Sequence, residues 1–138
     1  MNFKGKVSTW WKASILLIHA ALVAVFLVTF DISYTFQFLP AVLIIDLYLI
    51  PVMFRNYVTL DKNYVVVYFG LMKKTIPVKD IVLVKSVKNS RASFAASSDR
   101  LSLQIEHLAD VEVSLEDPNG FVKKLSKYNR KIMRAVGE

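Results

Sequence analysis

The first third of the chain is almost continuously apolar, whereas the rest alternates between apolar and polar positions. Residues 13–54 contain no Lys or Arg, and Asp31 and Asp46 are their only formal charges. Crossing the hydrocarbon core of a bilayer takes a helix of about 20 apolar residues, so this stretch is long enough for two spans. The sequence Asp-Ile-Ser-Tyr-Thr that begins at Asp31 predicts the turn between them. We expect a transmembrane helical hairpin with spans at about 13–30 and 36–54.

The charges on either side of this hairpin predict its orientation. Lys4, Lys6 and Lys12 precede the first span, the turn carries only Asp31, and basic residues outnumber acidic ones after residue 55. An excess of Lys and Arg marks the cytoplasmic side of a membrane. We therefore expect a multi-pass protein of the cell membrane with both termini in the cytoplasm.

A cleaved signal peptide is the alternative interpretation of the first span. Ala21 and Ala24 loosely fit a cleavage site, but the apolar run continues beyond them and no polar segment precedes them. An uncleaved anchor fits this pattern better.

Two polar side chains lie inside the predicted spans. His19 is about a third of the way along the first span, and Asp46 is near the middle of the second. At about 1.5 Å of rise per residue, both lie on the order of 10 Å from the cytoplasmic interface, so the two side chains are at similar depth. Ionisable groups are costly in a membrane. The pair either joins the helices by a hydrogen bond or has a proton-linked or ligand-linked function.

Three further residues mark the ends of the spans. Trp10 and Trp11 precede the first span, and tryptophan prefers the headgroup level of a membrane. Pro40 is expected in the first turn of the second helix, where its missing N–H costs little.

After residue 55 the pattern becomes that of β-structure. β-branched and aromatic residues between polar turns predict strands at 57–60, 64–69, 74–76 and 81–87. Strict alternation at 101–106 and 111–115 predicts two more strands, each with one buried and one solvated face. The small and polar segment 91–98 predicts a loop or an edge. The order of about six strands is that of an antiparallel meander.

The last predicted element is an amphipathic helix that ends before Gly137. Asp117 is a favourable N-cap, and Pro118 suits the first helical position. Its apolar stripe consists of Phe121, Leu125, Tyr128 and Ile132. Its opposite face carries Lys123, Lys124, Lys127, Arg130, Lys131 and Arg134. This basic face is either solvated or lies against anionic lipid headgroups, at about 1 kcal/mol per Lys or Arg.

Together these elements predict an α+β membrane protein in two parts. Residues 1–55 hold the cytoplasmic N-terminus and the transmembrane hairpin, and residues 56–138 form the β domain with its helix. A sheet of this kind curls into a small sandwich or barrel, with the helix covering an open end.

Two motifs in the second part resemble the YyaB-like bacterial PH-domain family. One is Lys-Thr-Ile-Pro-Val-Lys-Asp-Ile at 74–81, and the other is Ser-Ser-Asp-Arg-Leu-Ser-Leu-Gln-Ile at 97–105. Leu115 departs from the family, in which Pro follows the strand-end serine. The resemblance extends over about 55–132 and implies a pleckstrin-homology-like sandwich or barrel of six or seven antiparallel strands, capped by the C-terminal helix. It also implies a two-helix membrane anchor, but no particular ligand.

Arg100 lies inside the second motif and has two interpretations. In the structural one, Asp99 and Arg100 satisfy each other and the backbone of the preceding loop. In the functional one, Arg100 and Arg91 receive an anionic group such as a phosphate or carboxylate. The serines that would assist them are Ser90, Ser93, Ser97 and Ser98.

No catalytic, metal or cofactor site is expected. The chain has no Cys, four Gly and two His, which leaves no thiolate chemistry, no Gly-rich phosphate loop and no ligand cluster with metal spacing. The net charge of +7 does not indicate nucleic acid, because the domain is tethered and shows no motif that reads it. We expect a protein that is not an enzyme.

The remaining features favour a membrane-anchored binding module. We expect it to bind a protein, a peptide or an anionic lipid at the cytoplasmic face of the membrane, in envelope stress or in self-protection against a peptide antibiotic. The alternative is a small accessory subunit of a transporter or channel that acts through its transmembrane hairpin.

Overall fold

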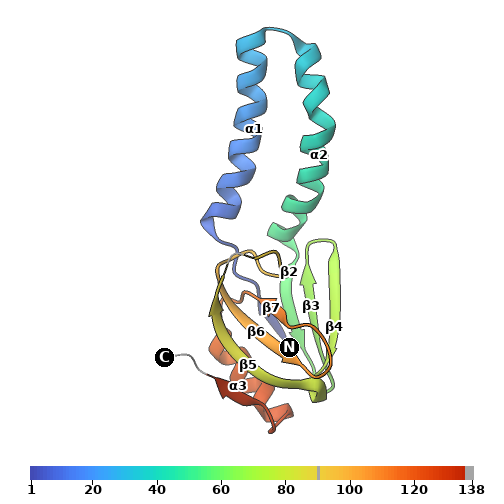
Figure 1. Ribbon diagram of the computed structural model, residues 1–138, viewed down its shortest axis with the longest axis vertical. Coiled ribbons are helices and arrows are strands. Elements are labelled where there is room, and N and C mark those ends of the chain that lie inside the picture. The colour runs from blue at the N-terminus through green and yellow to red at the C-terminus, as the bar shows by residue number, and fades with distance from the viewer. Residues whose placement is uncertain (90, 136–138) are drawn as a thin grey trace.

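A long helical hairpin extends from one end of a small β domain (Figure 1). This computed structural model describes residues 1–89 and 91–135, without the side chains of residue 35 and residues 133–135.

The hairpin consists of α1 (Thr9–Thr29) and α2 (Ile32–Phe54). Both helices are long and apolar enough to cross a membrane by length and composition. The turn between them is shorter than predicted, because Asp31 caps α2: its Oδ1 accepts a hydrogen bond of 2.8 Å from the N–H of Ser33. Pro40 therefore lies in the interior of α2, and the prediction that it occupies the first turn is wrong.

The base of the hairpin packs on the β domain through a small core of its own. Val52 of α2 is fully buried together with Phe69 and Ala96 of the domain. Trp11 lies with its ring centroid 5.9 Å from that of Phe69, and its indole N–H donates to the carbonyl of Leu49 over 3.2 Å. Trp11 belongs to α1 and therefore joins this helix both to α2 and to the domain beneath the hairpin.

Within the described residues, the β domain contains two four-stranded sheets. The first has the order β1-β2-β3-β4 and the second β7-β6-β5-β8. Neighbouring strands are antiparallel except β5 and β8, which are parallel. Their bounds are Asn2–Lys4 (β1), Asn56–Leu60 (β2), Tyr64–Phe69 (β3), Met72–Pro77 (β4), Ile81–Lys88 (β5), Asp99–Ile105 (β6), Val111–Val113 (β7) and Met133–Ala135 (β8). The six predicted strands are present as β2 to β7, whereas β1 and β8 were not predicted.

Strand β1 precedes the hairpin in the chain but belongs to the β domain. It pairs with β2, with Phe3 opposite Val58, and the N-terminal ammonium donates to the carbonyl of Leu60 over 2.9 Å. The chain then crosses to the second sheet, where the N–H of Lys6 donates to the carbonyl of Ser114 over 3.0 Å. Residues 1–7 thus close the gap between the two sheets. The sequence-based division at residue 55 placed them in a cytoplasmic N-terminus, in the same part of the chain as the hairpin.

Helix α3 (Pro118–Tyr128) begins where the sequence predicts it. The Asp117 side chain accepts from the N–H of Gly120 over 2.8 Å, and Phe121 and Leu125 are fully buried. Phe121 packs edge-on against Phe3, with ring centroids 5.3 Å apart. The main core therefore lies between the two sheets and α3.

The prediction that this helix continues to Gly137 is wrong. It ends at Tyr128 because the Asn129 side chain donates to the carbonyls of Val78 and Ile81, over 2.8 and 3.1 Å, and turns the chain. The backbone then pairs as β8 along the edge of β5. Ile132 is buried outside the helical stripe. Arg130 and Lys131 follow the helix, and the side chain of Arg134 lies outside the described residues.

Replacing Phe3 tests whether the segment before the hairpin is part of the domain core. We expect Phe3→Ala to lower the free energy of unfolding by about 3–5 kcal/mol, because the deletion opens a cavity against Phe121. Urea unfolding of the full chain in detergent micelles, followed by near-ultraviolet circular dichroism, measures the change. Lys4→Ala in the same strand is the control, since its exposed ion pair with Glu116 contributes little. An equal effect of the two substitutions would contradict this placement of Phe3.

Candidate functional site

A cleft of about 750 Å³ lies where the hairpin meets the β domain. One wall comes from the lower turns of α1 and α2, and the other from the loop that joins β5 to β6. The hairpin contributes mostly apolar side chains, namely Trp10, Trp11, Leu17, Ile18, Tyr48 and Leu49, with Ser8 and Ser14. The loop contributes mostly small and polar residues, namely Arg91, Ala92, Ser93, Ala95, Ala96, Ser97 and Ser98, with Arg100 behind them. The cleft thus has an apolar side continuous with the hairpin and a polar side on the domain.

The N-terminal segment brings these two walls together. Val7 forms a parallel bridge with Ala96, and the N–H of Ser8 donates to the carbonyl of Ala96 over 2.9 Å. Helix α1 begins at the next residue, so its first turn is held directly against the loop. The Ser8 hydroxyl oxygen is inaccessible to solvent and has no hydrogen-bond partner among the described residues.

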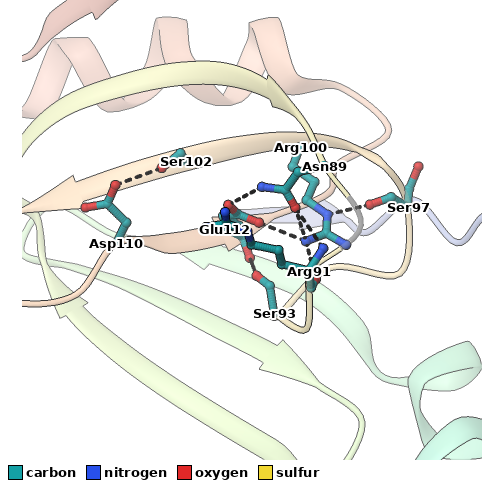
Figure 2. A network of polar contacts seen from close by, with 8 residues as sticks. All are labelled: Asn89, Arg91, Ser93, Ser97, Arg100, Ser102, Asp110 and Glu112. Atoms are coloured by element: carbon teal, nitrogen blue, oxygen red, sulfur yellow. Dashed lines mark hydrogen bonds and ion pairs between the residues drawn. The ribbon is translucent and has the colours of Figure 1, made fainter.

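Arg100 organises the loop from within (Figure 2). Its Nε donates to the carbonyl of Ser97 over 2.7 Å, and its Nη1 donates to the carbonyl of Arg91 over 2.6 Å. The same Nη1 reaches the Glu112 carboxylate at 2.8 Å and the Asn89 side-chain oxygen at 2.9 Å. The guanidinium therefore holds both ends of the loop. Its side chain is only 5% exposed, which favours the structural interpretation of this residue.

The structural interpretation expected Asp99 to be the partner of Arg100. The structure shows that the partner is Glu112. Successive residues of a strand face opposite sides of a sheet, so Asp99 and Arg100 diverge. Asp99 instead pairs with Lys6 over 2.8 Å. Ser102 lies opposite Glu112 in the β6–β7 register, which places Arg100 and Glu112 on the same face. The period-two alternation of the sequence places Arg100 and Glu112 each on the polar face of its strand. Only the β6–β7 register shows that the two side chains meet.

The surroundings of the Glu112 carboxyl favour its ionised form. Burial would raise its pKa, but hydrogen bonds from Arg100 and Asn89, with the charges of Arg100 and Arg91, outweigh this effect and hold the pKa below its ordinary value of 4.5. The Asn89 amide donates to Oε1 over 2.6 Å, so both carboxylate oxygens are engaged.

Arg91 is the exposed cation of the cleft. Its carbonyl is held by Arg100, while its side chain is exposed and forms no ion pair with the described residues. Of the serines expected near it, Ser93, Ser97 and Ser98 line the cleft, and Ser90 lies outside the described residues. The anion-binding role of Arg91 and Arg100 stays a prediction. Of the two guanidinium groups, only that of Arg91 is exposed to solvent.

His19 and Asp46 face each other across the hairpin. His19 Nε2 lies 3.1 Å from Asp46 Oδ2, and His19 Nδ1 lies 2.8 Å from the carbonyl of Ile15. Because a carbonyl only accepts, Nδ1 carries a proton. The contact with Asp46 then needs one further proton, on either the imidazole or the carboxyl. The second carboxyl oxygen of Asp46 is buried without a partner in the described part of the chain. The role of the pair stays a prediction.

The basic residues near the C-terminus lie away from this cleft. Figure 1 shows α3 at the end of the β domain opposite the hairpin. Lys123, Lys124 and Lys127 belong to α3, and Arg130 and Lys131 follow it. A membrane spanned by the hairpin would therefore lie at the other end of the domain. The predicted contact of these residues with headgroups gains no support from this placement.

Two sheets closed by a C-terminal helix define a PH-like α+β domain. Residues 56–129, more than half of the chain, match the bacterial PH domain, and the chain belongs to this family. The match confirms the bacterial PH resemblance, while the YyaB-like subfamily stays a prediction. Comparison with curated proteins and with solved structures gave no match. Within the described residues, no group of three His, Cys, Asp or Glu side chains could hold a metal ion.

Acidification tests the Arg100 network. The pKa of Glu112 is lowered in the folded state, so its contribution to stability is complete above about pH 4.5 and disappears as the pH falls through the folded-state pKa. We expect Glu112→Gln to cost about 1.5–3 kcal/mol at pH 7 and to flatten the pH dependence below pH 4.5. Urea unfolding in micelles between neutral and acidic pH measures both effects. Glu106→Gln, at the exposed β6–β7 turn, is the control and should follow the unsubstituted chain. Parallel curves for Glu112→Gln and the unsubstituted chain would contradict the assignment.

Proposed function

We propose that this chain is a membrane-anchored, non-catalytic bacterial PH domain that binds an anionic lipid in the cleft at the base of its hairpin. The proposal includes insertion of α1 and α2 into the cell membrane with both termini in the cytoplasm. Three observations support this orientation: two apolar helices, the lysines Lys4 and Lys6 before α1 with Lys12 in its first turn, and a turn that carries only Asp31.

The composition of the cleft carries the proposal. A lipid molecule beside the hairpin would place its acyl chains along Leu17 and Ile18, and its headgroup beside Arg91 and the loop serines. Trp10 and Trp11 lie at the start of α1 and line the same cleft, and indole rings favour the headgroup level. Apolar helical side chains and an exposed arginine thus follow one another in the same order as the acyl chains and the anionic headgroup of a lipid. A role in envelope stress or in protection against a peptide antibiotic is a further hypothesis about the process served.

A second candidate function rests on the contact between His19 and Asp46. A hairpin that served only as an anchor would not need an ionisable pair at a distance of 3.1 Å. The alternative is therefore an accessory subunit of a transporter or channel, in which this pair has a proton-linked role or lines an interface with a neighbouring helix. If the pair is structural, replacing either residue will weaken the association of the two helices and leave other properties unchanged.

Quenching of tryptophan fluorescence by brominated lipids tests the lipid proposal, because the two tryptophans of the chain both line the cleft. In nanodiscs we expect stronger quenching by brominated phosphatidylglycerol than by brominated phosphatidylcholine. Arg91→Ala should weaken the apparent affinity for the anionic lipid about fivefold, the equivalent of about 1 kcal/mol for one cation near the membrane.

The matched control for Arg91→Ala is Arg55→Ala. Arg55 is an exposed cation at the end of α2, stacks on Tyr68 at 4.9 Å and does not line the cleft. We expect this variant to keep the lipid preference. Equal losses in the two variants, or no preference in the unsubstituted chain, would refute a lipid site in the cleft. Quenching that is relieved by an added peptide would transfer the site to a peptide ligand.

A double-mutant cycle on His19 and Asp46 tests the second candidate. For a structural pair we expect a coupling free energy of about 0.6–1.7 kcal/mol between His19→Ala and Asp46→Ala, with unchanged lipid quenching in both variants. Unfolding in micelles measures the coupling. Proton flux into proteoliposomes that is present in the unsubstituted chain and absent in Asp46→Asn would favour the transport function instead.

A further inference from the structure

A second cleft, of about 810 Å³, lies at the other end of the β domain. Three segments meet there: the turn between β2 and β3, the connection from β4 to β5, and the residues at the end of α3. Only Arg55 separates α2 from β2, and β2 is five residues long, so its far end lies roughly 16 Å from the hairpin. The β2–β3 turn at that end contributes Lys62 to the cleft.

The charge of this cleft is strongly positive. Lys62, Lys79, Arg130 and Lys131 line it, and Asp80 is its only carboxylate among the described residues. None of the four cations forms an ion pair within the part of the chain that the structure describes. Four unpaired cations around one concavity create a positive potential that attracts an anionic partner.

Hydrogen bonds fix the backbone that carries these cations. The Asn129 amide joins the end of α3 to the carbonyl of Val78 over 2.8 Å, and its oxygen accepts from the N–H of Lys131 over 3.0 Å. On the other wall, the N–H of Val78 donates to the carbonyl of Asn63 over 2.9 Å. The three segments are therefore tied to one another, and little ordering of the backbone would be needed on binding.

Two half-exposed tyrosines add a second type of contact. Tyr64 and Tyr128 line the same cleft and are 49% and 37% exposed. Their rings offer apolar area, and their hydroxyls offer hydrogen bonds at low entropic cost. Combined with the four cations, they fit a ligand that alternates carboxylates with aromatic or aliphatic groups. Asp80 among the cations disfavours a ligand with a dense run of phosphates.

We propose that this cleft binds an acidic peptide segment of a protein partner on the side of the domain away from the hairpin. The site is distinct from the cleft at the hairpin base and does not depend on lipid binding there. With both sites occupied, the chain would join a membrane lipid to a partner protein at the opposite end of one rigid domain.

Fluorescence anisotropy with a fluorescein-labelled random copolymer of glutamate and tyrosine tests this site, using the full chain in nanodiscs of zwitterionic lipid. We expect saturable binding that weakens with added salt. The double variant Lys79→Ala, Arg130→Ala should bind about tenfold more weakly. The control Lys123→Ala, Lys127→Ala removes the same charge from α3 outside the cleft and should bind like the unsubstituted chain. Unchanged unfolding midpoints in both variants show that folding is preserved.

Three outcomes would overturn the proposal. The first is no binding of the copolymer to the unsubstituted chain, and the second is an equal loss in the two double variants. The third is that a single-stranded oligonucleotide of similar charge binds more tightly than the copolymer and loses this binding in the Lys79→Ala, Arg130→Ala variant. That result would assign the surface to nucleic acid. Tryptophan quenching by lipid should be unchanged in the double variant Lys79→Ala, Arg130→Ala. Failure of this proposal and failure of the lipid site are therefore distinguishable.

Discussion

Backbone pairing of the first seven residues with both sheets is the constraint on which the rest of the structure depends. These residues precede the hairpin, so the two long helices form the connection between β1 and β2. The N–H of Gly5 donates to the carbonyl of Asn56 over 2.8 Å, and a side chain at Gly5 would collide with that of Asn56. Both ends of the hairpin are therefore held at one edge of the domain. Trp11 and Val52 then pack the helical bases onto it.

This arrangement also creates the cleft at the hairpin base. The β5–β6 loop is fixed by Arg100, which binds the carbonyls of Ser97 and Arg91 in the loop and the carboxylate of Glu112 on β7. Arg100 thus holds the loop in one shape, while the side chain of Arg91 is exposed at the surface of the loop. Desolvation offsets much of the Coulomb energy of a buried ion pair of this kind.

The two clefts lie at opposite ends of the domain and differ in chemistry. The one beside the hairpin combines apolar helical side chains with a polar loop, and the one near the end of α3 combines cations with tyrosines. In the proposed function, a transmembrane hairpin that is continuous with the sheet through β1 would keep the domain close to the membrane surface in a defined orientation. A domain tethered in this way would meet membrane-bound ligands at a high effective concentration.

Local patterns determined the two helices, the six strands β2 to β7 and the start of α3, because apolar runs, period-two alternation and the Asp117 cap act within a few residues. Only the tertiary structure decided β1, β8, the end of α3 and the partner of Arg100. The residues of β1 and β8 show no alternation that marks them as strands in the sequence, and their pairing joins segments 50 or more residues apart. The end of α3 depends on Asn129 reaching the carbonyls of Val78 and Ile81, and the Arg100–Glu112 pair depends on the β6–β7 register. Composition alone shows which side chains carry charge; the sheet register decides which of them meet.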